Sequence, residues 1–166
     1  WWCWHHGGME MGGQSHPGDP RYHAFRGIKA ALANARTYGR EPAVRILQNY
    51  GTGPGLCDIR DGLYTGRSSG YQAINLAVHL GVVRILLLGF DMRAIDGRTH
   101  WHMAHKRPTA PGDFAKEMLP HFASLAVPLA GRCIEIINCT PGSAIDCFPR
   151  GRIESALFEL PRTQAA

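Results

Sequence analysis

GRSSGYQAINLAVHLGVVRILLLGFD, residues 66–91, is the stretch of this chain that decides the fold class. It opens with a glycine–serine loop, and serine is a preferred residue immediately before a helix. Residues 73–80 leave almost no polar side, which predicts a helix packed against a sheet, and Gly81 predicts its end. Residues 82–88 form a continuous β-branched and leucine run, which is typical of a parallel strand covered on both faces.

Further strands are predicted on either side of this unit. Residues 43–48 and 133–137 are short apolar runs with strand character. The segment 25–35 fits either a strand, around residues 27–32, or a short helix. Residues 50–67 are expected to form a long irregular loop.

Two helices are predicted after the central unit. An apolar stripe predicts a helix over residues 114–130, capped by Asp113 and kinked or shortened by Pro120 and Pro128. A short helix is expected over residues 153–158. Alternating strands and helices imply right-handed crossovers and therefore an α/β fold with a mostly parallel sheet.

Length and composition indicate one folded domain over residues 1–166. Apolar residues make up 45% of the chain and charged residues 19%, which is typical of a globular protein and not of a disordered one. No apolar run is long enough for a membrane span. Since the chain begins at Trp1 without an initiator methionine, we expect that an upstream N-terminal part is missing.

Cysteine and charge usage point to a cytoplasmic protein with a small-molecule partner. The five cysteines are odd in number and show no CxxC spacing, which favours reduced thiols. The net charge is +5 and arginine dominates the basic residues, which suits a phosphate-bearing ligand, although a generally arginine-rich proteome explains it equally well. No basic stripe with interleaved aromatic residues is present, so nucleic-acid binding is weakly supported.

The loop before the central helix is the first candidate ligand site. Arg67, Ser68, Ser69 and Gly70 place a guanidinium and unpaired backbone N–H groups at a helix N-terminus, where phosphate is favoured. The sequence matches neither the Walker A loop nor the dinucleotide GxGxxG pattern. An ordinary capped helix is the alternative.

A second group of candidate residues follows the predicted strands. Gly89 and Asp91 end the strand of the central unit, where a carboxylate can hold a ribose hydroxyl or a metal–phosphate. Asn138, Thr140 and Ser143 follow the next strand and are expected beside Asp91, because neighbouring parallel strands end at the same edge. Turn and cap roles are the alternative for all of them.

Three histidines form the third candidate site. His100, His102 and His105 lie within six residues, and we expect one of them to act as a general base or a phosphate ligand. Their spacing is not that of a zinc protease, so no structural metal site is predicted. Surface histidines without a function are the alternative.

The segments SSGYQAINLAVHLGVVRILLLGFDM and INCTPGSAIDCFP resemble a set of uncharacterised, often prophage-associated bacterial proteins with a Rossmann-like fold. These are distantly similar to 6-hydroxymethylpterin diphosphokinase-like proteins and to the sialyltransferases of glycosyltransferase family 42. The resemblance covers residues 66–149 and implies a three-layer Rossmann-like fold. It also implies nucleotide contacts at Ser69-Gly70 and at Gly89-Phe90-Asp91, and less directly at Asn138 and Ser143.

Three functions follow from these observations. The first is a nucleotide-binding transferase that moves a glycosyl group from a nucleotide-sugar or a diphosphate from ATP, with Mg²⁺ accompanying the nucleotide. The second is a non-catalytic, prophage-derived module that binds a nucleotide or another ligand. The third is a metal-dependent hydrolase built on the histidine cluster. The sequence does not decide whether the chain is an enzyme, and it leaves the oligomeric state open.

Overall fold

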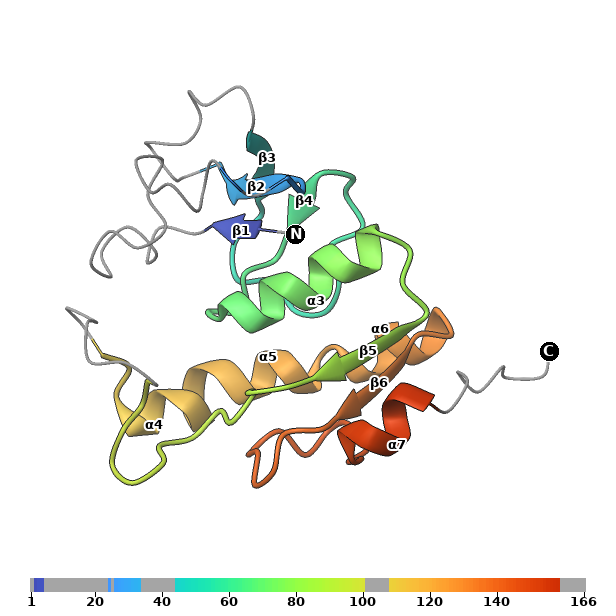
Figure 1. Ribbon diagram of the computed structural model, residues 1–166. Coiled ribbons are helices and arrows are strands. Elements are labelled where there is room, and N and C mark those ends of the chain that lie inside the picture. Colours follow the sequence, from blue (N-terminus) through green and yellow to red (C-terminus); the bar gives the residue numbers. More distant parts are fainter. Residues whose placement is uncertain (1, 5–23, 25, 34–43, 101–107, 159–166) are drawn as a thin grey trace.

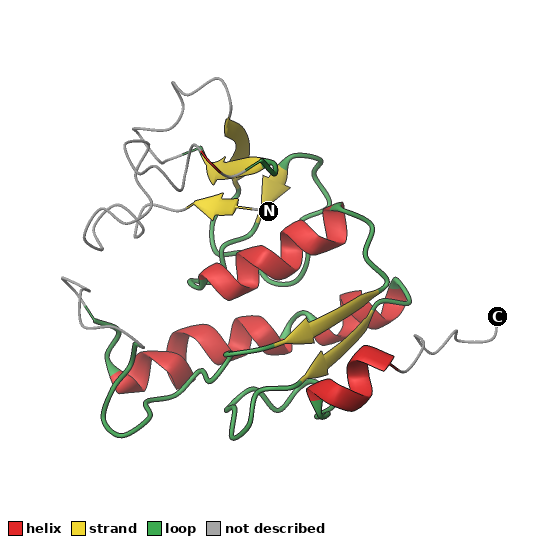
Figure 2. Ribbon diagram, in the orientation of Figure 1, coloured by secondary structure: helices red, strands yellow, loops and turns green. Residues whose placement is uncertain are grey.

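The protein is an α/β protein whose parallel strands form two small sheets, with helices packed against them (Figures 1 and 2). The computed structural model describes residues 2–4, 24, 26–33, 44–100 and 108–158. Within these residues the strands do not join into the one sheet that the sequence predicts.

The first sheet contains four parallel strands in the order β1-β2-β3-β4. Their bounds are Trp2–Trp4 for β1, Lys29–Leu32 for β2, Val44–Asn49 for β3 and Gly62–Leu63 for β4. The strand predicted over residues 43–48 is confirmed as β3, and β2 decides between the two alternatives for residues 25–35 in favour of a strand. The expectation of an entirely irregular loop over residues 50–67 is wrong, because β4 lies inside it.

The second sheet pairs β5 (Arg84–Leu87) with β6 (Glu135–Asn138) in parallel. In the register of this pair Leu87 lies opposite Asn138. The prediction that the strand before Asp91 and the strand that ends near Asn138 are neighbours is therefore confirmed. Their carboxyl ends lie at the same edge, where ligands bind in many α/β proteins.

The expectation that both faces of β5 are covered is wrong. Only Leu87 is buried in this strand, and the flanking Val83 and Leu88 are 61% and 56% exposed. β5 pairs with β6 on one side and has no described strand on the other, so it is also an edge of its sheet within the described residues. A run of apolar residues indicates a strand's tendency to be buried, whereas the elements that pack on its two faces decide how much burial its side chains obtain.

Helix α3 (Ser69–His79) lies between the two sheets (Figure 1). Its residues Tyr71 and Ile74 belong to the larger hydrophobic cluster, which includes Leu87 of β5. Its Leu76 belongs to a second cluster with residues of β2, β3 and β4. The helix lacks a polar side in its middle because it is packed on two faces, as its sequence predicts.

A bent helical run covers the larger cluster. It consists of α4 (Pro111–Asp113), one π-helical turn η1 (Phe114–Met118), α5 (Leu119–Ala123) and α6 (Ala126–Gly131). The π turn closes with a hydrogen bond from Leu119 N–H to Phe114 O, directly before Pro120. The break between α5 and α6 comes four residues before Pro128, whose ring and missing N–H disturb the preceding turn. The predicted kinks are thus confirmed.

Two smaller features complete the fold. Asp113 does not precede the helical run as its N-cap, because Pro111 starts the run earlier and the Asp113 carboxylate accepts from Ala110 N–H at 3.1 Å. The last predicted helix is confirmed as α7 (Ile153–Phe158). Arg84 of β5 donates to Ala156 O at 3.0 Å and thereby ties α7 to the second sheet.

Candidate functional site

The first turn of α3 is capped as the sequence predicts. Ser68 has extended backbone dihedral angles, and its hydroxyl accepts from Gly70 N–H at 3.2 Å. Gly66 and Arg67 precede it with positive φ angles of 47° and 56°. The other N–H groups of the first turn have no partner inside the helix. Ser69 is exposed beside them, so this end of the helix offers backbone donors to an anion.

Gly70 brings the two predicted ligand segments into contact. A Cβ atom placed on Gly70 would lie 2.5 Å from Cε1 of Phe90, so the ring occupies the space that a side chain would need. Phe90 stands between Gly89 and Asp91 at the end of β5. The beginning of α3 and the carboxyl end of β5 are therefore neighbours, and packing against Phe90 is sufficient reason for a glycine at position 70.

The loop after β6 holds the backbone of Phe90. Thr140 Oγ1 accepts from Phe90 N–H at 3.0 Å and donates to Leu87 O at 3.2 Å. Ser143 Oγ donates to Phe90 O at 2.6 Å and accepts from Ile145 N–H at 3.1 Å. These bonds fix the end of β5 to the loop after β6.

Asn138 fixes that loop in turn. Its Oδ1 accepts from Thr140 N–H and its Nδ2 donates to Ile145 O, each at 3.1 Å. Asn138, Thr140 and Ser143 are between 1% and 5% exposed. The structure therefore brings these three predicted residues beside Asp91 and gives their side chains backbone partners. Direct ligand contact by them stays a prediction.

Asp91 is the residue of this group whose side chain is not used by the fold. Its backbone O accepts from Ala144 N–H at 2.8 Å, which anchors the main chain. The side chain is half-buried, and no described residue gives its carboxylate a hydrogen bond or an ion pair.

Gly89 has a φ of +72° with open space around it, so glycine is required there by the backbone.

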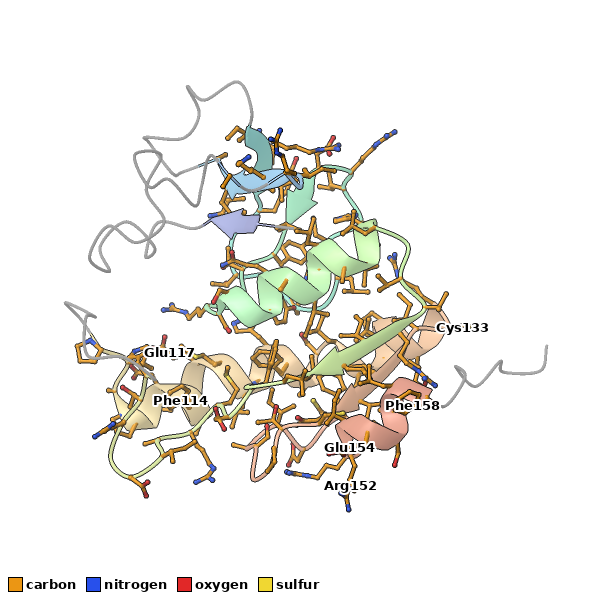
Figure 3. The ribbon with its side chains drawn as sticks, viewed as in Figure 1. Phe114, Glu117, Cys133, Arg152, Glu154 and Phe158 are labelled. Atoms are coloured by element: carbon orange, nitrogen blue, oxygen red, sulfur yellow. The ribbon has the colours of Figure 1, made fainter. Side chains whose placement is uncertain are left out.

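Arg67 has a partner that the sequence did not indicate. Its guanidinium forms an ion pair with the Glu117 carboxylate of η1 at 2.7 Å, and Glu117 lies on the side of that turn facing α3 (Figure 3). The two side chains are 56% and 43% exposed. Ion pairs this exposed contribute little free energy, so Arg67 remains able to exchange Glu117 for a phosphate.

The predicted histidine cluster is described only at His100. Its Nε2 accepts from Thr109 N–H at 3.1 Å, which connects the two sides of the loop after β5. His102 and His105 lie outside the described residues. Within the described ranges no three His, Cys, Asp or Glu side chains are grouped for a metal ion.

Asn49 is a polar residue at the edge of the first sheet that sequence reasoning missed. It ends β3, and its Oδ1 accepts from Gly51 N–H at 2.9 Å. Asn138 makes the same bond two residues ahead at the end of β6. The signal was present in the sequence, because each asparagine follows a strand and precedes a turn rich in glycine, threonine or proline.

Tyr71 fastens the loop before α3 to the bent helical run. Its hydroxyl donates to Gly55 O at 2.6 Å, and its ring meets His121 and Phe122 edge to face. Gly55 N–H in turn donates to Ser124 Oγ at 2.7 Å. Long irregular loops are often mobile. The loop before α3 is instead held at Gly55, whose backbone groups bind Tyr71 of α3 and Ser124 after α5.

Tyr71→Phe is expected to lower the free energy of unfolding by about 1 kcal/mol at pH 8, because the Gly55 carbonyl loses its buried donor. Burial raises the pKa of the Tyr71 hydroxyl above 10.0. The folded state thus binds this proton more tightly, and the stabilisation is present below pH 10 and is lost as the pH rises through the folded-state pKa. Urea unfolding at pH 8 and above pH 10 should show that the difference in free energy of unfolding between wild type and variant becomes smaller at the higher pH.

Tyr50→Phe is the matched control for this measurement, since Tyr50 is 45% exposed. It should leave the free energy of unfolding almost unchanged at both pH values. A Tyr71→Phe variant that is as stable as wild type at pH 8 would contradict the fastening role.

Comparison with family models, with curated proteins and with solved structures finds no match for the chain. None of the helices in the described ranges has the length and apolar character that crossing a bilayer requires. The geometry of the site is therefore the basis for a functional proposal.

Proposed function

We propose that the protein is a nucleotide-binding transferase with a Rossmann-like three-layer fold, and that its ligand lies between the beginning of α3 and the carboxyl end of β5. The observation that carries the proposal is the Asp91 carboxylate, which is half-buried and without a partner among the described residues. A half-buried carboxylate costs free energy unless something pairs with it. Asp91 follows directly after Phe90, whose ring rests on Gly70.

The roles of the residues follow from their chemistry. The first turn of α3 and Arg67 hold the phosphates, because backbone N–H groups and a guanidinium both favour anions. Asp91 accepts from a ribose hydroxyl or binds Mg²⁺ that arrives with the phosphates. A single carboxylate is sufficient for such an ion, since Mg²⁺ commonly takes one or two carboxylates and its other ligands from phosphates and water. Transfer of a glycosyl or diphosphate group then depends mainly on positioning.

A second candidate, a module that binds the ligand without turnover, is favoured by one observation. His100 Nε2 already accepts from Thr109 N–H, so that nitrogen is not available as a general base in this arrangement. His102 and His105 remain the candidates for the base in the transferase. The hydrolase hypothesis has no support from the described residues, among which no three His, Cys, Asp or Glu side chains are grouped for a metal ion.

Calorimetry of the wild-type protein with CMP, UDP and ADP, each with and without Mg²⁺, tests the proposal. We expect one of the three to bind, and more tightly with Mg²⁺ if Asp91 holds the ion. Release of free nucleotide from a CMP- or UDP-sugar, or of AMP from ATP, then separates a transferase from a module that only binds. Absence of binding by all three nucleotides would show that the proposed function is wrong.

A further inference from the structure

Gln72 of α3 carries a buried polar atom that the fold does not satisfy. The residue is 8% exposed, and its Oε1 is buried without a hydrogen-bond partner in the described structure. In this orientation of the amide, Oε1 is a buried acceptor that receives no donor. Buried polar atoms in native proteins are nearly always paired, so this one calls for an explanation.

The neighbouring amide in the same helix shows the usual situation. Asn75 is 1% exposed, and its Oδ1 accepts from Cys57 N–H at 2.9 Å while its Nδ2 donates to Tyr71 O at 3.3 Å. The fold thus provides partners for the more deeply buried amide and leaves none for Oε1 of Gln72. Gln72 is 8% exposed and Asn75 is 1% exposed, so Gln72 is the residue of the two that lies nearer to the surface.

The position of Gln72 relates it to the candidate site. Gln72 precedes Leu76 by four residues and therefore shares its helix face, which packs on the first sheet. It stands one turn after Ser68, and helical side chains lean towards the N-terminus of their helix. That end of α3 follows β4 after a short loop, so it lies by the carboxyl edge of the first sheet.

We propose that Gln72 is a specificity-determining residue that accepts a hydrogen bond from the nucleoside part of the ligand, through a ribose hydroxyl or an amino group of the base. This inference rests on the proposed nucleotide site at the beginning of α3. An amide oxygen needs a donor, and a phosphate at neutral pH offers mainly acceptors. Gln72 therefore recognises the nucleoside, whereas the N–H groups of the first turn hold the phosphate.

The test compares Gln72→Met with wild type by calorimetry, using inorganic pyrophosphate and whichever of CMP, UDP and ADP wild type binds best. Methionine keeps the length of the side chain and removes both polar atoms. We expect the affinity for the nucleotide to fall about tenfold or more, the affinity for pyrophosphate to stay the same, and the melting temperature to stay equal or rise. Gln48→Met, on exposed β3 surface, is the matched control and should change none of these values.

Each other outcome has a definite meaning. If Gln72→Met binds the nucleotide as tightly as wild type does, the inference is wrong and the proposed function stands. If the variant loses pyrophosphate and nucleotide equally, Gln72 supports the helix end and does not recognise a nucleoside, which also overturns it. If wild type binds the nucleotide no more tightly than pyrophosphate, the nucleoside contributes no affinity, and the inference that Gln72 recognises it is wrong. If wild type binds neither probe, the proposed function and this inference fail together.

Discussion

Phe122→Ala is expected to lower the free energy of unfolding by about 3–5 kcal/mol, the cost of deleting a fully buried aromatic side chain. Phe122 is 0% exposed in α5. Its ring meets Tyr71 edge to face at a centroid distance of 5.8 Å and Phe90 at 6.1 Å. Removing it leaves a cavity where α5, the beginning of α3 and the end of β5 come together.

Urea unfolding followed by circular dichroism measures this loss. Val127→Ala, in α6 and 81% exposed, is the matched control and should stay within about 0.5 kcal/mol of wild type. Because natural domains are stabilised by only about 5–15 kcal/mol, Phe122→Leu provides a milder second variant, expected to lose about 1–1.5 kcal/mol. A loss below 1 kcal/mol for Phe122→Ala would mean that these three elements do not share one core.

The contacts of Phe122 also show which parts of the fold local sequence can predict. The α3–β5 unit was predictable because its glycine–serine start, its apolar helix and its apolar strand run all lie within residues 66–91. The β4 strand was missed, since its two residues, Gly62 and Leu63, carry no periodic pattern and pair only through β3. The burial of β5 was overestimated because it depends on the elements that pack on the two faces of the strand, and nothing within residues 82–88 specifies them.

The candidate site illustrates the same limit with side chains. A glycine at position 70 suggests close approach of a ligand, and the structure shows a Phe90 ring against it, a contact twenty residues away. Asn138 has the chemistry of a ligand contact, but its amide is occupied by backbone groups that only the folded loop presents. The adjacency of Asp91 and the loop after β6 was predictable, because it follows from parallel pairing of β5 and β6.

Asp91→Asn is expected to weaken nucleotide binding about 10- to 100-fold, equivalent to about 1.4–2.8 kcal/mol, with the melting temperature nearly unchanged. Asparagine keeps the size of the side chain and removes its charge. The backbone O of residue 91 still accepts from Ala144 N–H, so the anchoring of the loop does not depend on the carboxylate. Since the carboxylate has no partner in the described structure, the fold loses no interaction and only the ligand or its Mg²⁺ does.

Asp96→Asn is the matched control, an exposed aspartate five residues later in the turn bridged by Ile95 and Arg98. Calorimetry and thermal unfolding of both variants should show a loss of affinity for Asp91→Asn alone. A fall in the melting temperature of Asp91→Asn would reveal a structural partner for the carboxylate. Unchanged affinity together with an unchanged melting temperature would place the ligand elsewhere on the molecule. The two measurements thus separate a carboxylate retained for a ligand from one that the fold requires, because only the first loses affinity without losing stability.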